Sequence, residues 1–455
     1  MARFRVEQLG GWGNYPVLSG NVYRPEKISE VRELVTGNEQ SSLITRGLGR
    51  SYGDAALNEK SGVMLYERLN RMLDFNPASG WLRCEAGVSI QEILDVFVPR
   101  GFFPPVTPGT KFVTLGGAIA ADVHGKNHHR DGCISEFVDE FQLLTGRGQV
   151  LVCSRAQNAD AFWATIGGMG LTGVILTAKL RLIPVASAYL AVDYKKTRNL
   201  DQTLEAFGEG DAAYPYSVAW IDCLASGASL GRSVLMRGNH AGVAELPEKF
   251  RRNALNLQGK KTKSMPCNMP GFALSHWTVK AFNSVFYWRH NDGRKFVDYD
   301  SFFYPLDSIG NWNRMYGKRG FVQYQAALPR ETSRTGLIAM LEELSRSGRA
   351  SFLAVLKTFG PENRGLLSFP RAGQTLAIDL PNTGQSMRES LARLDAIVVK
   401  NGGRVYLAKD ACLDRPTFEA MYPRLNEFKQ VKSRLDPNNR FSSSQARRLG
   451  IMEGR

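Results

Sequence analysis

Two glycine-rich stretches contain residue types that can hold an anion close to the backbone. Residues 44–54 read ITRGLGRSYGD, and residues 114–129 read TLGGAIAADVHGKNHH. Gly47 and Gly49 let backbone N–H groups approach an anion, while neighbouring arginine and serine side chains add charge and donors. In the second stretch, glycines and alanines leave room for a flat ring to lie against the backbone. Such surroundings suit a large, flat cofactor that carries a diphosphate.

A third stretch, IGGMGLTGVI at residues 166–175, strengthens this interpretation. A single G-x-G after a strand is more often a tight turn than a ligand site. Three glycine-rich stretches in one region favour a site. The first two match neither G-x-G-x-x-G nor G-x-x-x-x-G-K-[ST], which argues against an ordinary Rossmann or kinase-type nucleotide site.

Two lysines interrupt apolar, strand-like runs. Lys357 lies in FLAVLKTFG, and Lys409 lies in RVYLAKD. Most lysines are solvated, but a lysine flanked by strand residues on both sides must point into a cavity or pair with an anion. The pattern therefore leaves two alternatives for each lysine, a place in a cavity or a partner anion.

His124, His128 and His129 cluster in DVHGKNHH and raise the question of a metal site. No cysteine or carboxylate stands at zinc-like spacing, and Gly125 and Lys126 interrupt any helix that would align the imidazoles. The six cysteines include no C-x-x-C pair and are expected to be free thiols. The sequence predicts no metal centre, and His128 and His129 are expected to be hydrogen-bonded loop residues.

Strand and helix patterns alternate along the chain, which indicates an α+β protein with two lobes. We expect a first domain over residues 1–185, a second over residues 186–410, and helices over residues 411–455 that return to the first domain. Strand patterns in the second domain include YSVAWIDCL, FVQYQAALP, SFLAVLKTF and TLAIDL, and helix patterns include ETSRTGLIAMLEELSRSG and SMRESLARLDAIVVKNGG. The expected arrangement is an antiparallel sheet with helices on one face, leaving the other face to cover the cofactor.

The net charge of +15 calls for an anionic partner. Nucleic acid would satisfy it, but no recognition motif accompanies the charge, so no nucleic-acid binding is expected. Residues 248–290 interleave Lys and Arg with aromatic and aliphatic side chains, which suits the boundary of an anionic lipid surface. The alternative is a plain surface loop packed on the second lobe. The chain shows no apolar run of about 20 residues and no signal-peptide core, so we expect a cytoplasmic protein, peripheral at the inner face of the cell membrane.

Residues 15–186 resemble the FAD-binding domain of the vanillyl-alcohol oxidase and p-cresol methylhydroxylase superfamily. The order of signals matches: RPEKISEVRELV, RGLGRSYGD, a strand-turn-strand, a helix that begins at Ser89 with Glu92 three residues on, PPVTPGTKFVTLGGAIAADVHG, a hairpin and AFWATIGGMGLTGVILTAKLRLIPV. The resemblance implies a PCMH-type FAD-binding domain joined to an antiparallel-sheet substrate domain. It implies these cofactor contacts: Arg46, Gly47, Leu48, Gly49, Arg50, Ser51, Tyr52, Gly109, Thr114, Gly116, Gly117, Ala121, His124, Gly170, Ile175 and Tyr406.

The flavin is expected to be non-covalent, because Arg50 stands beside Ser51 where members with a covalent bond commonly have a histidine. RGLGRSYGD, DVHGKNHH and the C-terminal stretch from RVYLAKD onward are similar to the branch that oxidises polyprenylphosphoryl ribose for arabinan precursors of the cell wall. That similarity implies catalytic roles for Lys409, His124 and Tyr52, with the base being either Lys409 or His124.

The same similarity implies substrate contacts from Lys126, Gln325 and Lys357, with Gln323 a weaker candidate. It also implies a polyprenyl-phosphate sugar as substrate, a short-chain reductase as partner and a quinone-like electron acceptor. An aldonolactone or alditol oxidase is the alternative enzyme. A basic membrane- or nucleic-acid-associated protein without catalysis is the alternative of another class.

Overall fold

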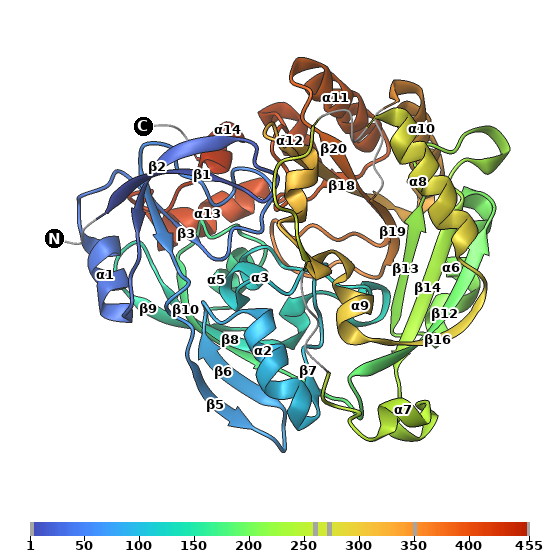
Figure 1. The fold of residues 1–455 in the computed structure, drawn as a ribbon. Coiled ribbons are helices and arrows are strands. Elements are labelled where there is room, and N and C mark those ends of the chain that lie inside the picture. Colours follow the sequence, from blue (N-terminus) through green and yellow to red (C-terminus); the bar gives the residue numbers. More distant parts are fainter. Residues whose placement is uncertain (1–3, 258–262, 271–274, 349–352, 453–455) are drawn as a thin grey trace.

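The FAD-type lobe expected over the first part of the chain is built on two sheets, shown in blue and teal in Figure 1. The computed structural model describes residues 4–257, 263–270, 275–348 and 353–452. The first sheet has the strand order β1-β2-β4-β3 and is mixed, and the second has the order β5-β6-β10-β8-β9 and is antiparallel. Their strands are β1 Arg5–Gly10, β2 Val17–Tyr23, β3 Leu43–Arg46, β4 Gly62–Leu65, β5 Met72–Asn76, β6 Trp81–Glu85, β8 Val138–Leu144, β9 Val150–Ser154 and β10 Val174–Arg181.

Short helices surround these sheets: α1 Ile28–Thr36, α2 Ile90–Phe97, α3 Leu115–Ala120, α4 His128–Asp131 and α5 Ala159–Thr165. The predicted start of α2 is confirmed. Ser89 accepts a hydrogen bond from the Glu92 backbone, and Glu92 accepts one from the Ser89 backbone, which closes a capping box. Every third or fourth residue of α2 is then buried, so the helix stays fixed against the core that carries the glycine-rich stretches.

The second lobe contains an eight-stranded sheet with the order β16-β12-β14-β13-β19-β20-β18-β21. All of its strand pairs are antiparallel. This sheet confirms the expected antiparallel substrate domain. Its strands are β12 Tyr189–Thr197, β13 Tyr216–Ile221, β14 Ser233–His240, β16 Gly293–Asp298, β18 Phe321–Pro329, β19 Ala354–Phe359, β20 Gly373–Pro381 and β21 Arg404–Val405.

Helices α6 (Leu200–Gly210), α10 (Arg330–Ser347) and α11 (Gln385–Lys400) form one layer on this sheet. Helix α10 contacts both of the others and buries leucine and methionine side chains against β18 and β20. The opposite face turns toward the first lobe, as expected. The outer end of that face is not free, however. Helix α8 (His276–Arg289) packs there, with Phe286 and Trp220 ring centroids 4.5 Å apart.

The smaller elements are β7 Phe102–Phe103, β11 Ile183–Pro184, α7 Glu248–Arg251, β15 Lys263–Ser264, α9 Tyr299–Phe303 and β17 Ile309–Gly310. The C-terminal helices are α12 Arg415–Met421, α13 Leu425–Leu435 and α14 Ser444–Arg448. Helix α13 contacts α5 of the first lobe, whereas α12 contacts α11 of the second. Only part of residues 411–455 therefore returns to the first lobe. None of the helices in the described ranges combines the length and hydropathy that crossing a bilayer requires.

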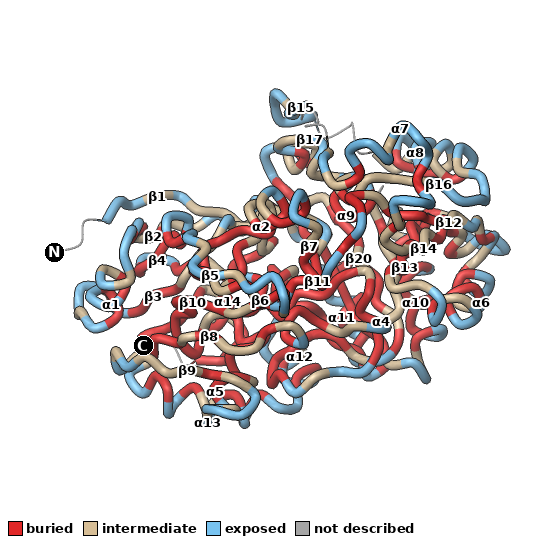
Figure 2. Tube along the Cα trace, turned by 90° about the horizontal axis from the view of Figure 1, so that it is seen from below, coloured by how far each residue is buried: buried red, intermediate tan, exposed pale blue. Residues whose placement is uncertain are grey.

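The buried side chains run continuously through both lobes, as the tube view from below shows (Figure 2). Several main-chain hydrogen bonds join the two lobes, and in one of them Tyr52 N–H donates to the carbonyl of Ala408 at 3.0 Å. Beside it, a side chain at Gly53 would stand 1.9 Å from the carbonyl oxygen of Asp410. This close approach places the end of the first glycine-rich stretch directly next to Lys409.

Candidate active site

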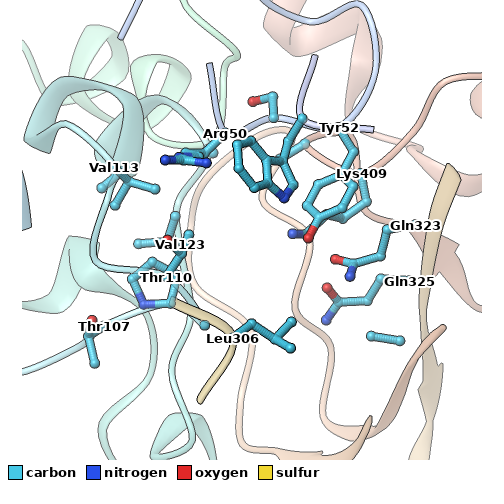
Figure 3. A pocket seen from close by; sticks show the side chains of 18 of the residues that line it. Arg50, Tyr52, Thr107, Thr110, Val113, Val123, Leu306, Gln323, Gln325 and Lys409 are labelled. Atoms are coloured by element: carbon cyan, nitrogen blue, oxygen red, sulfur yellow. The ribbon is translucent and has the colours of Figure 1, made fainter. Parts of the chain in front are cut away.

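A cavity of about 800 Å³ lies between the two lobes. Its volume falls within the roughly 300–1,000 Å³ typical of small-molecule and cofactor sites. Figure 3 shows Arg50, Val113 and Thr107 on one side and Lys409, Gln323 and Gln325 on the other. All three glycine-rich stretches contribute to the lining, as does the free face of the eight-stranded sheet.

The glycine-rich wall is packed too tightly for side chains. A side chain at Gly47 would stand 2.3 Å from Oγ1 of Thr114, and one at Gly116 would stand 2.8 Å from Cβ of Ala86. Gly49 has a φ of +65°, which favours glycine. Gly109, in contrast, has no atom within 4 Å of its missing side chain and faces open space. This wall has the smooth surface and free backbone that a flat cofactor with a diphosphate requires, so the residues present fit FAD.

The structure brings the predicted cofactor contacts together with one exception. These residues line the cavity: Gly47, Leu48, Gly49, Arg50, Ser51, Tyr52, Gly109, Thr114, Gly116, Gly117, Ala121, His124, Gly170, Ile175 and Tyr406. Arg46 does not. Its Nη2 donates to the carbonyl of Gly10 at 2.7 Å, and its guanidinium packs against Gly49. Arg46 therefore supports the loop, because its guanidinium occupies the space where a side chain at Gly49 would stand.

Arg50 is held between two aromatic rings. Its guanidinium carbon lies 3.8 Å from the centroid of the Trp12 ring and 5.2 Å from that of Phe112. Burial lowers its pKa from the ordinary value, and the Asp307 carboxylate partly opposes this. Trp12 was not singled out from the sequence. Its position after a glycine pair gave no chemical signal.

Strand register brings distant residues into one row across the second wall. Gln325 of β18 pairs with Ala377 of β20, which pairs with Val355 of β19, which pairs with Trp220 of β13. All four residues line the cavity. Along this row the side chains change from the polar Gln325 to the aromatic Trp220, whose ring centroid lies 4.5 Å from that of Phe286 on α8. The wall therefore changes from polar to apolar along its length.

Lys126, Lys357 and Lys409 all line the cavity. Burial lowers the pKa of Lys126 to about 7, of Lys357 to about 8 and of Lys409 to about 7. The charge of Lys357 lowers the pKa of both other lysines further, so its ammonium group repels each of theirs. Within the described ranges, none of the three forms an ion pair with a carboxylate. This cluster would gain most from an anion bound between its members.

Lys409 stands beside Tyr52, as expected, with its Nζ 3.9 Å from the centroid of the Tyr52 ring. A third residue belongs to this group and was missed. Asp379 is fully buried, and its charge raises the pKa of Lys409 against the effect of burial. Gln323 Nε2 donates to Asp379 Oδ1 at 2.7 Å, and the Tyr316 hydroxyl donates to Oδ2 at 3.2 Å. TLAIDL carried the same signal as the lysines, a charge in an apolar run.

His124 is buried beside Gln325. The Gln325 amide Nε2 lies 3.0 Å from His124 Nε2 and 3.2 Å from Oγ1 of Thr375. Because the amide donates, His124 Nε2 accepts, and the ring proton belongs on Nδ1. Burial, Lys357 and the other cations lower the pKa of His124 well below its usual value. His124 is thus a neutral ring whose basic nitrogen is already occupied.

Lys126 donates from Nζ to the carbonyl of Phe302 and lies 4.1 Å from that ring's centroid. Tyr406 crosses the lobes, since its hydroxyl donates to the Ala121 carbonyl at 2.8 Å. His128 Nδ1 accepts from the Gly360 N–H at 3.1 Å, and His129 Nε2 lies 2.9 Å from the Tyr214 carbonyl. The described residues contain no group of three or more side chains that could hold a metal ion.

Comparison with known proteins identifies the family of this chain. Residues 20–154 match the FAD binding domain model, and residues 381–449 match the D-arabinono-1,4-lactone oxidase model. The chain is 37% identical to decaprenylphosphoryl-beta-D-ribose oxidase of Mycolicibacterium smegmatis over 98% of both chains. It is 23% identical to L-gulonolactone oxidase of Scyliorhinus torazame over 92% of both.

A further relative is an uncharacterised protein of Streptomyces coelicolor, 32% identical over 80% of this chain and all of the relative. The identity to the M. smegmatis oxidase extends over both lobes and therefore over both walls of the cavity. The chain belongs to the family of decaprenylphosphoryl-beta-D-ribose oxidase, and it is an FAD-dependent oxidoreductase.

Proposed function

We propose that this protein oxidises the 2′-hydroxyl of a polyprenylphosphoryl ribose to the keto sugar. The observation that carries the proposal is the cluster of Lys126, Lys357 and Lys409 beside the cofactor wall, without a carboxylate paired to any of them in the described ranges. A phosphodiester is the substrate feature that such a cluster would bind. The M. smegmatis relative is named for a substrate with this group.

Lys409 is the base in this proposal. An amine can take the hydroxyl proton only when it is neutral, and burial brings the pKa of Lys409 to about 7. Its place against the Tyr52 ring holds Nζ at the junction of the two cavity walls. His124 is less suited, because its Nε2 already accepts from Gln325. We assign His124 and Gln325 to orienting the sugar.

Bound FAD would supply the oxidation by accepting the hydride from the carbinol carbon. The chain's own part is to hold that carbon against the glycine-rich wall and to move the hydroxyl proton to Nζ of Lys409. Lys126 and Lys357 bind the phosphodiester, which relieves the repulsion between the two ammonium groups. Tyr52, neutral because burial raises its pKa well above the usual value, lines the cavity beside Lys409.

The partners follow from the chemistry of this reaction. The keto sugar would pass to a short-chain reductase that restores a hydroxyl with the opposite configuration. The electrons would pass to a quinone-like acceptor. Because the substrate carries a lipid, the protein would work as a peripheral protein at a membrane.

A lactone oxidase is the second candidate, favoured by the match of residues 381–449 and by the L-gulonolactone oxidase relatives. A sugar lactone carries no charge, so it would leave Lys126 and Lys357 without a counter-ion. A sugar lactone also has no lipid chain that would contact the apolar end of the cavity wall.

The test compares two classes of substrate under anaerobic conditions. Stopped-flow absorbance should show flavin reduction by farnesylphosphoryl ribose and none by D-arabinono- or L-gulono-1,4-lactone. Lys357→Gln should raise KM at least about 10-fold with a smaller change in kcat, since it removes a binding charge. Reduction by the lactones with a higher kcat/KM would replace the proposal with the second candidate.

A further inference from the structure

Helix α8 presents apolar aromatic side chains outward. Trp277, Val285 and Trp288 are 76%, 63% and 68% exposed, and we call these three residues the outer face of α8. Their spacing places them along one side of the helix. The helix sequence HWTVKAFNSVFYWR contains no acidic residue, and Lys280 and Arg289 are exposed on it. An exposed apolar stripe with basic flanks is a feature that soluble surfaces rarely keep.

The inner side of the same helix lines the cavity. Thr278, Val279, Phe282 and Phe286 all contribute to the lining. Opposite them lies the apolar end of the eight-stranded sheet, where five residues line the cavity: Tyr194, Val218, Trp220, Met236 and Val297. The cavity thus runs from the glycine-rich wall, past the lysines, to an apolar end directly beneath α8.

The cavity reaches the surface on this same side. Ile309 lines it and is 36% exposed. Figure 2 shows α8, α7 and the β15–β17 pair along one side of the molecule. Helix α7 carries the exposed residues Lys249 and Arg251. The cavity opening, helix α8 and the basic residues of α7 therefore lie on the same side of the molecule.

We infer that the outer face of α8 docks on an anionic lipid bilayer, so that the lipid chain of the substrate enters the apolar end of the cavity directly from the membrane. This inference rests on the proposed function for the identity of the lipid. Tryptophan is favoured at the boundary between headgroups and acyl chains, and Lys280 and Arg289 complement anionic headgroups. The expected membrane-contacting segment, residues 248–290, is thereby narrowed to α8; residues 258–262 and 271–274 lie outside the described part of the chain.

Vesicle sedimentation with the FAD-loaded protein tests the docking. The double variant Trp277→Ser/Trp288→Ser should bind phosphatidylglycerol–phosphatidylcholine vesicles at least about 10-fold more weakly than the parent. Its matched control, Val6→Ser/Leu73→Ser, removes side chains that are 67% and 48% exposed on the first lobe and should bind like the parent. All four positions are exposed, so the fold should survive.

A second double variant, Lys280→Gln/Arg289→Gln, tests the contribution of the basic residues. Binding to anionic vesicles should fall about 30-fold, while binding to pure phosphatidylcholine should stay at the parental level. The control is Lys27→Gln/Arg32→Gln, two exposed basic residues at α1. Parental vesicle binding by both α8 variants would overturn the inference.

Flavin reduction separates this inference from the proposed function. The Trp277→Ser/Trp288→Ser variant should reduce its flavin at the parental rate with micellar farnesylphosphoryl ribose. It should do so at least about 10-fold more slowly with the decaprenyl substrate embedded in vesicles. Slowing with both substrates would assign α8 to the site itself and refute docking. A parent inactive with both substrates, yet bound to vesicles through α8, would refute the proposed function alone.

Discussion

The two walls of the cavity are built in different ways. The first-lobe wall is largely backbone, smoothed by Gly47, Gly116 and Gly117, and Arg50 is held there between aromatic rings. The second-lobe wall is made of side chains, with the titratable residues Lys357 and Lys409 among them. A backbone surface does not titrate, so binding to the first-lobe wall should not change with pH. The second-lobe wall contains buried titratable groups, so the reaction rate should depend on pH.

Replacing Lys409 should have the largest effect. Lys409→Ala should slow anaerobic flavin reduction by roughly 10²- to 10⁴-fold at saturating substrate, because a positioned base is lost. Lys126→Ala is the matched control: it removes a buried lysine from the same cavity and should act mainly on KM. Reduction at the parental rate in Lys409→Ala would pass the base role to His124.

A side chain added to the glycine-rich wall should weaken the binding of FAD. Gly116→Val places its Cβ 2.8 Å from Cβ of Ala86, so the wall must shift. We expect FAD affinity to fall at least about 10-fold, measured as the flavin-to-protein absorbance ratio after gel filtration. Gly208→Val, where no atom lies within 4 Å, should keep its flavin. Full flavin content in Gly116→Val would show that this wall tolerates bulk.

The pH profile should identify the group that tunes Lys409. The pKa of Lys409 is lowered to about 7, and a base is active only when neutral, so kcat/KM should fall as pH drops through about 7. The Asp379 charge raises that pKa, so Asp379→Asn should move the inflection to lower pH.

The control for this shift is Asp395→Asn. Asp395 is another buried carboxyl whose pKa is raised to about 7, but it accepts from the Tyr324 hydroxyl away from the lysines. Its replacement should leave the inflection in place. An unchanged profile in Asp379→Asn would separate Asp379 from the chemistry.

The smallest effect concerns the flavin bond. With Arg50 beside Ser51, no histidine stands at the position that commonly forms the covalent link, so acid precipitation should release all flavin into the supernatant. Absorbance of the supernatant and of the redissolved pellet measures this directly. A yellow pellet would contradict a non-covalent cofactor.

Much of the fold could be predicted, because its signals are local. The α2 capping box, the strand patterns of the second lobe and the helix patterns at α10 and α11 each lie within one short stretch. Helix α8 was not predicted, since its aromatic residues follow no clear amphipathic period. The split of the C-terminal helices between two lobes was not predicted either. It depends on which surface each helix meets.

The candidate site, like the fold, could be predicted where the signal lies within one short stretch of sequence. Lys357 and Lys409 could be found because a charge in an apolar run must be accommodated somewhere. Arg46 was predicted to contact the cofactor but does not line the cavity, since a loop sequence does not say which of its arginines faces the cavity. Asp379 carried a readable signal, but its meaning required Lys409 as a neighbour.

The sequence alone determined two features of the site: glycine-rich stretches that suit a flat cofactor, and lysines in apolar runs that must be accommodated in the interior. Tertiary structure decided which groups act together. His124 and Gln325 are 201 residues apart and meet through the docking of two lobes. Lys409 meets Tyr52 through the main-chain bond from Tyr52 to Ala408. Local sequence sets which residues must be buried, but strand register and lobe contact set which of them share one cavity.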